Sequence, residues 1–231
     1  MAKISFWLGR LAELVYPTRC VSCAESGTLF CERCQGKLEP LDRWFCVVCG
    51  KAAVGGFTHP GCATRYTPER VLAGFFYRGS ARNLIKALKY RRIRPVAKVL
   101  AELLVEDLAG QGVDLGPHTL VAPVPLSFWR EGARGFNQSF LLAEAVAKRL
   151  NLPSRPRLLR KVKDTPSQVS LTKPERAANV RGTFAVPARL GGEDVLLVDD
   201  VLTTGATVRE AVKALKKAGA GQVWVLTFSK D

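Results

Sequence analysis

No run of apolar residues in this 231-residue sequence approaches the ~18 that a membrane-spanning helix needs. The first 15 residues are apolar but are interrupted by Gly9, Arg10 and Glu13, and they lack a small-residue cleavage site. We therefore expect neither a transmembrane segment nor a secretion signal, and we expect a cytoplasmic protein. Apolar positions in residues 1–16 recur at helical spacing, which predicts an amphipathic helix. It packs on its own protein or, as the alternative, docks on a partner or on the inner face of the membrane.

Cysteine is absent after Cys62: all seven cysteines lie between Cys20 and Cys62. A secreted disulfide scaffold would spread its cysteines, whereas close pairs without a secretion signal favour metal binding in a reducing compartment. The spacing predicts two structural zinc sites, each closed by four ligands. The predicted ligands are Cys20, Cys23, Cys31 and Cys34 in the first site, and Cys46, Cys49, His59 and Cys62 in the second. We predict pairing in sequence order, with a cross-braced arrangement as the alternative.

Acidic residues are scarce: the chain has 20 Asp and Glu against 35 Lys and Arg, which gives a formal net charge of +15. Residues 1–70 hold nine basic and six acidic residues, whereas residues 71–231 hold 26 and 14. The basic character therefore belongs to the second part of the chain. A basic domain attracts phosphate, either on a small substrate or along a nucleic acid backbone.

The chain divides into three stretches. Residues 1–16 are the predicted helix. Residues 17–68 are rich in Cys, Gly and Pro, which predicts a zinc-binding module whose folding energy comes from the metal. From residue 69 to 231, apolar strand patterns alternate with helical ones, which predicts an α/β domain with a mostly parallel sheet flanked by helices. We expect strands at 71–77, 120–124, 158–159, 184–186, 195–198 and 222–228. We expect helices at 95–108 and 206–218, and a helix that begins at 172. We expect two more that begin at N-cap residues: one from Ser80 to residue 90, and one from Asn137 to residue 150.

The segment after residue 194 carries the clearest chemistry. A buried strand ends in Asp199 and Asp200, and a short loop then opens a helix. Ligands of open α/β sheets bind at this end of the strands, and the free N–H groups of a helix start can hold a phosphate. The carboxylates can accept hydrogen bonds from ribose hydroxyls and stabilise positive charge on a reacting sugar ring. We therefore predict a ribose 5-phosphate site in which these two acids are catalytic. The predicted loop residues are Thr203, Thr204, Gly205, Ala206 and Thr207.

A second group of polar residues follows the predicted strand at 120–124. Arg130 and Arg134 can bind phosphate oxygens bidentately, and Asn137 opens a helix with free N–H groups. We predict that these three residues bind a diphosphate, with an exposed basic loop as the alternative. The polar segment 161–182 suits a lid over the site, or an ordinary surface loop.

Between Arg78 and Lys98 there are eight basic residues and no acidic one. We consider three explanations: a solvated cationic face, contact with nucleic acid, and contact with the diphosphate. The nucleic acid interpretation adds Tyr90 as a stacking ring. The residues that we assign to it are Lys86, Lys89, Arg91, Arg92 and Arg94.

The run VLLVDDVLTTGAT resembles the phosphoribosyl-diphosphate loop of type I phosphoribosyltransferases. The resemblance implies that Asp199 and Asp200 contact the ribose hydroxyls and that Thr203 through Thr207 hold the 5-phosphate. It also implies magnesium on the diphosphate, bound mainly by ligand oxygens and water.

Nearly the whole chain resembles the ComF family, also called ComFC or GntX. The resemblance lies in the paired cysteines and in the segments FYRGSARNLIKALKY, VAPVPL, RGFNQS, KDTPSQVSL and RAANVRGTF. His59 stands where many relatives have a cysteine. The resemblance implies a type I phosphoribosyltransferase-like domain behind a double zinc ribbon-like module. It further implies a role in natural competence, in which the protein handles incoming single-stranded DNA beside other DNA-uptake proteins.

Three functions fit these residues. The first is a transferase that moves a phosphoribosyl group to an acceptor that the sequence does not identify. The second is a non-catalytic adaptor that senses the phosphoribosyl ligand and binds single-stranded DNA. The third is a diphosphokinase that makes the sugar donor, against which the family resemblance argues.

Overall fold

The computed structural model describes residues 17–163 and 180–231. The predicted helix at 1–16 and most of the predicted lid lie outside these ranges, as does the predicted helix start at Thr172. At the centre is a parallel sheet of strand order β1-β6-β5-β2. Its strands are β1 (Arg70–Phe76), β2 (Leu120–Pro123), β5 (Val195–Leu202) and β6 (Val223–Lys230).

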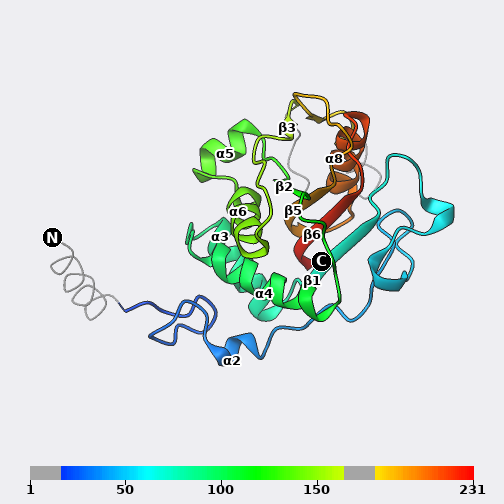
Figure 1. Cartoon of the computed structure of the whole chain (residues 1–231). Coiled ribbons are helices and arrows are strands. Elements are labelled where there is room, and N and C mark those ends of the chain that lie inside the picture. The colour runs from blue at the N-terminus through cyan, green and yellow to red at the C-terminus, as the bar shows by residue number, and fades with distance from the viewer. Residues whose placement is uncertain (1–16, 164–179) are drawn as a thin grey trace.

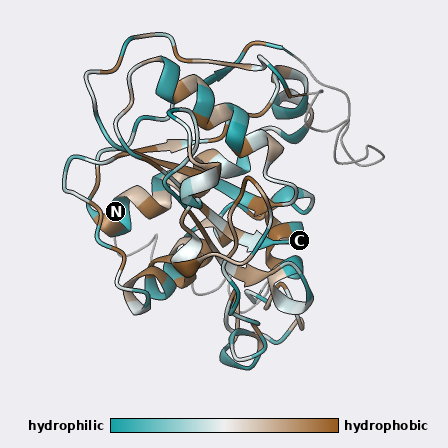
Figure 2. Ribbon diagram, turned by 90° about the vertical axis from the view of Figure 1, so that its right-hand side faces the viewer, coloured by the Kyte–Doolittle hydropathy of each residue, from teal (hydrophilic) through white to brown (hydrophobic). Residues whose placement is uncertain are grey.

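Helices cover both faces of this sheet, as Figure 1 shows. One face packs against three helices: α3 (Gly79–Lys89), α4 (Val96–Gly110) and α6 (Gln138–Leu150). The other face packs against α8 (Ala206–Lys217). Alternate residues of β5 point to opposite faces of the sheet. Leu196 packs into the layer of α3, α4 and α6, Leu197 packs into the layer of α8, and both are fully buried. Figure 2 shows the hydrophobic strands inside and hydrophilic residues on the outer helix faces.

The remaining elements are short. They are α2 (Glu32–Gln35), the 3₁₀ turns η1 (Val54–Gly56) and η2 (Pro60–Cys62), α5 (Phe128–Arg134), and an antiparallel pair of β3 (Arg160–Lys161) and β4 (Phe184–Ala185). None of the helices in the described parts of the chain has the length and apolar character that crossing a membrane requires.

The predicted α/β architecture is confirmed, but three local predictions were wrong. Arg78, not Ser80, precedes helix α3, and Ser80 is buried within its first turn. The short strand lies at Arg160–Lys161, just after the predicted 158–159. Strand β5 continues to Leu202 because β6 keeps pairing with it. The two aspartates therefore lie inside the last half of the strand, where the ladder fixes their backbone.

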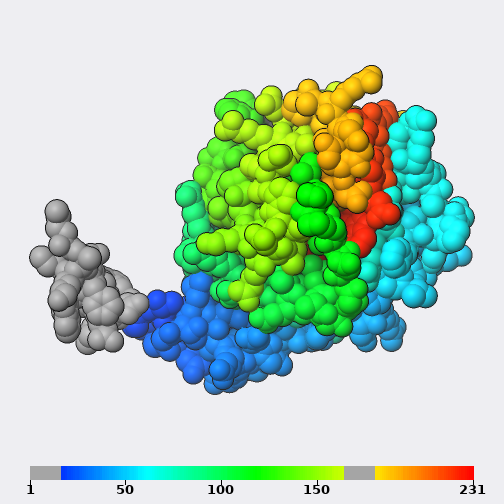
Figure 3. Space-filling view, in the orientation of Figure 1, coloured from blue at the N-terminus to red at the C-terminus, as the bar shows by residue number. Residues whose placement is uncertain are grey.

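The cysteine-rich segment wraps around the free edge of β1. Leu41 N donates to Gly74 O at 2.8 Å, Phe76 N donates to Glu39 O at 2.9 Å, and Thr58 N donates to Glu69 O at 3.0 Å. As a result the two cysteine clusters reach opposite faces of the sheet. The first packs into the layer of α3 and α4, and the second packs into the layer of α8. Figure 3 shows this segment, in blue to cyan, extending around the lower and right sides of the molecule.

Candidate functional site

The acidic pair at the end of β5 is held by residues from two helices. Lys89 Nζ, from the last turn of α3, lies 2.8 Å from Asp200 Oδ2. The side chains of Lys89 and Asp200 are 17% and 5% exposed, so this is a mostly buried ion pair. Burial acts to lower the pKa of Lys89, but the charge of Asp200 raises it above its usual value. Lys89 therefore carries the charge that offsets Asp200.

Asp199 has a different partner. Ser139 Oγ, in the first turn of α6, donates to Asp199 Oδ1 at 2.7 Å, and the backbone N–H of Asp200 donates to the same oxygen at 2.9 Å. Burial and then the neighbouring charge of Asp200 raise the pKa of Asp199 to about 7, against the opposing effects of Ser139 and Lys89. The Asp199 carboxyl therefore changes charge near neutral pH, which suits a group that responds to a bound cationic or hydroxyl-rich ligand.

The predicted phosphate loop joins β5 to α8. Thr203 is exposed, Thr204 and Thr207 are half-buried, and Gly205 and Ala206 are buried. Gly205 stands at the N-cap of α8 with φ +73°, a left-handed conformation that favours glycine. The first N–H groups of a helix have no partner within it and carry positive dipole character, so this turn can hold an anion.

The predicted diphosphate residues lie on and just after α5. Arg134 donates to Gln138 Oε1 and stands over the Tyr90 ring at 5.9 Å, while Arg130 is half-buried on the same short helix. Asn137 is buried: its Nδ2 donates to Val124 O at 3.1 Å, and its Oδ1 accepts from Ser139 N at 3.0 Å. Asn137 thus caps α6 as predicted and fixes the loop after β2. Contact of these three residues with a diphosphate stays a prediction.

The basic residues assigned to nucleic acid separate into two places. Lys86 is exposed on α3, and Arg91, Arg92 and Arg94 are exposed in the turn that follows. Lys89 instead faces Asp200. Arg92 donates to Ala133 O at 2.8 Å and Arg94 to Gly135 O at 3.3 Å, so this turn lies against the end of α5.

Both predicted metal sets come together in space. In each set, the four candidate ligand atoms all lie within 4.8 Å of one another. Burial acts to raise the pKa of Cys46, but backbone N–H groups directed at its sulfur, first that of Cys49, lower it to about 7. Arg33 lowers the pKa of Cys23 to about 6. Four ligand atoms at this spacing fit Zn²⁺, which binds cysteine in its deprotonated form, and the sets form in the predicted sequence order.

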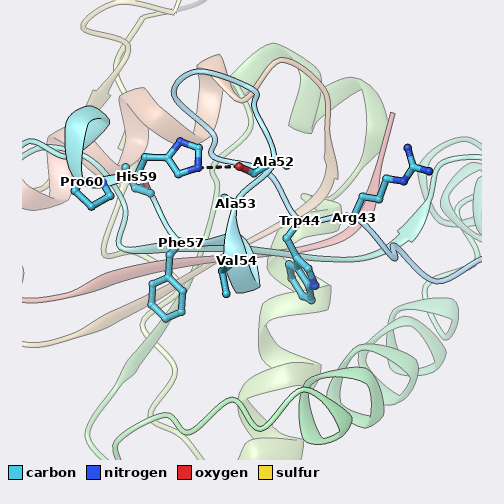
Figure 4. A pocket seen from close by; sticks show the side chains of 9 residues that line it. Arg43, Trp44, Ala52, Ala53, Val54, Phe57, His59 and Pro60 are labelled. Atoms are coloured by element: carbon cyan, nitrogen blue, oxygen red, sulfur yellow. Dashed lines mark hydrogen bonds between the residues drawn. The ribbon is translucent and has the colours of Figure 1, made fainter.

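His59 is oriented as a metal ligand. Its Nε2 lies 2.8 Å from the carbonyl oxygen of Ala52, and its Nδ1 lies 3.4 Å from Cys49 Sγ. Donation from Nε2 to this carbonyl leaves the Nδ1 lone pair facing the cysteines, the arrangement typical of ligating histidines. Figure 4 shows the ring pointing at Ala52, beside a pocket of about 620 Å³ that Trp44, Val54 and Phe57 help to line.

Sequence reasoning missed two features of this region. Ser139 follows the Asn137 cap, but nothing in the sequence links a serine there to an acid 60 residues later. Helix α5 was treated as a loop, so its aromatic pair was overlooked. Phe128 is 80% exposed and Trp129 is 74% exposed, and their rings meet edge to face at 5.9 Å.

Two family models match the chain. The phosphoribosyl transferase domain matches residues 137–229, and the double zinc ribbon domain matches residues 11–64. The fold is therefore a phosphoribosyltransferase-type parallel sheet with flanking helices and an N-terminal double zinc ribbon.

Curated relatives match most of the chain. Competence protein F of Haemophilus influenzae is 30% identical over 225 residues, which cover 90% of this chain and 96% of that protein. DNA utilization protein YhgH of Salmonella typhimurium is 31% identical over 78% of this chain and 82% of its own. Competence protein ComFC of Bacillus subtilis is 27% identical over 82% of this chain and 78% of its own.

Solved structures are more distant. The crystal structure of TT1426 from Thermus thermophilus matches 57% of this chain and 72% of its own with 22% identity and a TM-score of 0.33. Hypoxanthine phosphoribosyl transferase of Trypanosoma cruzi matches 59% of this chain and 64% of its own with 18% identity, also at 0.33.

Breaking the Lys89–Asp200 pair by removing one partner should be strongly destabilising. Lys89→Met leaves a buried carboxylate without its cation, so we expect the free energy of unfolding at pH 7 to fall by about 3 kcal/mol in urea titrations. Adding Asp200→Asn should recover most of that loss. Lys86→Met, on the exposed side of the same helix, should change stability by less than about 0.5 kcal/mol. A double variant that stays as destabilised as Lys89→Met would contradict the explanation that the loss comes from the unpaired Asp200 carboxylate.

Asp199 should make stability depend on pH. Its folded pKa of about 7 lies above the ~3.9 of an unfolded aspartate, so its contribution is present in acid and is lost as pH rises through 7. Asp199→Asn keeps the acceptor oxygen but stays neutral. We expect this variant to match the wild type near pH 4 and to exceed it by about 4 kcal/mol at pH 8 in thermal or urea unfolding. Asp114→Asn, at an exposed position, serves as the control. A difference that does not vary with pH would contradict the assignment.

Proposed function

Because this chain belongs to the family of competence protein F and ComFC, we propose that it binds phosphoribosyl diphosphate and acts on incoming single-stranded DNA. The observation that carries the first part is the acid pair Asp199–Asp200, followed within a few residues by a glycine turn at the start of α8. The setting that we propose is the cytoplasm, beside other proteins of DNA uptake.

In the proposed complex, each element of the site has one task. Asp199 and Asp200 accept hydrogen bonds from the two ribose hydroxyls. The N–H groups and hydroxyls of Thr203–Thr207 hold the 5-phosphate. Arg130 and Arg134 lie on the diphosphate side. Magnesium, when bound, would neutralise the diphosphate through its oxygens.

The chemistry that we propose is transfer of the phosphoribosyl group. The bond between C1 of the sugar and the diphosphate oxygen breaks, the diphosphate leaves with the electron pair, and an acceptor nucleophile bonds to C1. The acids stabilise the positive charge that develops on the ring.

One observation favours the alternative of a ligand-sensing adaptor without turnover. Asp200 is already paired with Lys89, and Asp199 is already hydrogen-bonded by Ser139. A site whose carboxylates have internal partners can exchange those partners for ligand hydroxyls and so change the position of α3 or α6. Such a site can report that ligand is bound without catalysing a reaction.

The DNA part of the proposal rests on a surface that we call the aromatic-basic surface. It comprises the exposed rings of α5 and the exposed cations of α3 and of the turn after α3. Hydrogen bonds from Arg92 and Arg94 to the carbonyl oxygens of Ala133 and Gly135 hold this turn against the end of α5. Tyr90, 70% exposed, stands between the two groups under Arg134. Exposed rings stack on unpaired bases and cations follow the backbone, which is how single strands are bound without sequence preference. The members of the surface are Lys86, Tyr90, Arg91, Arg92, Arg94, Phe128 and Trp129.

Calorimetry tests the ligand. With Mg²⁺ present, phosphoribosyl diphosphate should bind the wild-type protein, and the Asp199→Asn, Asp200→Asn double variant should bind at least about tenfold more weakly, because it loses two charged acceptors. Asp114→Asn should bind normally. Absence of heat with the wild-type protein would refute the proposed ligand. Release of diphosphate on addition of single-stranded DNA or free bases would then separate transferase from adaptor.

Fluorescence anisotropy tests the DNA surface. Trp129→Ala should weaken binding of a labelled single strand about tenfold and leave the salt dependence unchanged, because it removes a stacking ring. Lys86→Gln should lower the slope of log K against log salt by about 0.7. Phe57→Ala and Lys217→Gln, an exposed ring and an exposed cation away from this surface, are the matched controls. Equal effects of test and control variants would remove the surface from the proposal.

A further inference from the structure

Each cysteine set begins with a Cys-x2-Cys turn, which we call a zinc knuckle: Cys20–Cys23 in the first set and Cys46–Cys49 in the second. Each knuckle buries one valine, at the same place in the turn. Val21 follows the first cysteine of Cys20–Cys23, and Val47 follows the first cysteine of Cys46–Cys49. They are 7% and 6% exposed. Val21 packs into the layer of α3 and α4, whereas Val47 packs with Leu202 and Val208, on either side of the phosphate loop. The two knuckles are therefore alike in sequence but rest on different parts of the domain.

Val47 lies directly against the turn of the phosphate loop. A Cβ added to Gly205 would stand 2.6 Å from Val47 Cγ2, which is closer than a Cβ approaches a non-bonded atom. Gly205 is thus required twice, for its φ of +73° and for the room that Val47 occupies. Any displacement of the knuckle removes the group that packs against this turn.

A polar pocket of about 460 Å³ lies where the knuckle meets the loop. Residues 45–50 form one wall, and Thr203, Thr204 and Arg209 belong to the other. The Nε of Arg209 is buried and has no hydrogen-bond partner among the described residues. The guanidinium group of Arg209, a lining residue beside two threonines, fits an anion.

The end of β6 completes this pocket. Lys230 stands over the Phe45 ring with its Nζ 4.8 Å from the ring centre, and Asp231 is the one acidic residue of the lining. The pocket therefore lies at the carboxyl edge of the parallel strands, where open α/β sheets bind ligands. In Figure 1 the second zinc segment, in cyan, lies beside β6 and α8, and Figure 3 shows its atoms next to theirs.

We propose that the second zinc knuckle forms one wall of the site for the phosphate monoester end of the sugar ligand, with Val47 as its positioning residue and Arg209 as an additional anion contact. The inference rests on the proposed function and adds a role for the second zinc site that the first does not share. Zinc at Cys46, Cys49, His59 and Cys62 fixes the turn that carries Val47. Val47 in turn fixes Gly205 and the loop N–H groups that follow it.

The contribution of the knuckle is one of shape, because its own N–H groups are already used. Those of Val48 and Cys49 point at the Cys46 sulfur. They cannot also face an anion on the other side. Loss of the second zinc should therefore weaken the phosphate end of the ligand and leave the diphosphate end, near α5, unaffected.

The experiment compares matched valines in the full-length protein. Val47→Ala and Val21→Ala are each titrated with ribose 5-phosphate and, separately, with Mg²⁺ and inorganic diphosphate, and native mass spectrometry counts the zinc ions. We expect both variants to retain two zinc ions. Val47→Ala should lose about fivefold or more in affinity for ribose 5-phosphate and none for diphosphate, and Val21→Ala should lose neither.

Three further variants strengthen the comparison. Cys49→Ser and Cys23→Ser each remove one exposed ligand from one zinc site. The first should lose one zinc ion and most ribose 5-phosphate binding, and the second should lose one zinc ion and keep that binding. Arg209→Gln should weaken ribose 5-phosphate with the zinc content intact.

The outcomes separate this inference from the proposed function. Wild-type affinity for ribose 5-phosphate in Val47→Ala and Cys49→Ser overturns the inference alone. Equal losses for the two knuckles, or parallel losses of ribose 5-phosphate and diphosphate, overturn it as well, because they indicate a general loss of structure. Failure of the wild-type protein to bind phosphoribosyl diphosphate overturns the proposed function itself.

Discussion

The structure depends on keeping two adjacent carboxylates at the end of a buried strand. Unpaired acids there would oppose folding, since removing charge from water is costly. Lys89 and Ser139 meet this requirement from two different helices, so the positions of α3 and α6 relative to β5 are tied to the chemistry of the site. Burial and the charge of Asp200, opposed by these two contacts, raise the pKa of Asp199 to about 7. A residue that was expected on a DNA-binding face thus belongs to the acidic site.

The zinc segment does not stand apart from the α/β domain but packs on it. It follows the free edge of β1 and reaches both layers of the core, with Val21 on one side and Val47 on the other. Each knuckle lacks a core of its own, so the metal fixes the turn and the turn supplies an apolar side chain to the neighbouring layer. The double zinc ribbon and the sheet therefore stabilise each other, and the metal sites are part of the architecture around the ligand edge.

Much of this could be predicted from sequence because it follows short-range rules. Cysteine spacing gave both metal sets, Asn137 was recognisable as a cap, and strand–helix alternation indicated the parallel sheet. Other features depend on contacts between distant residues. Ser139 reaches Asp199 across 60 residues and Val47 reaches Gly205 across more than 150, and no local pattern records either contact. Helix α5 was missed because its seven residues carry exposed rings in place of an apolar stripe.

The hydrogen bonds that residues 39–41 and 58 make along β1 have a consequence for the behaviour of the protein in solution. An open strand edge invites pairing with another molecule, and natural proteins protect such edges. Here the protection is provided by a segment tethered at both ends by zinc ligands, Cys34 before it and Cys62 after it. Demetallated protein would present a bare, strongly apolar β-edge to its neighbours. Metal binding at the two cysteine sets therefore also helps to keep the edge of the sheet covered against pairing with another chain.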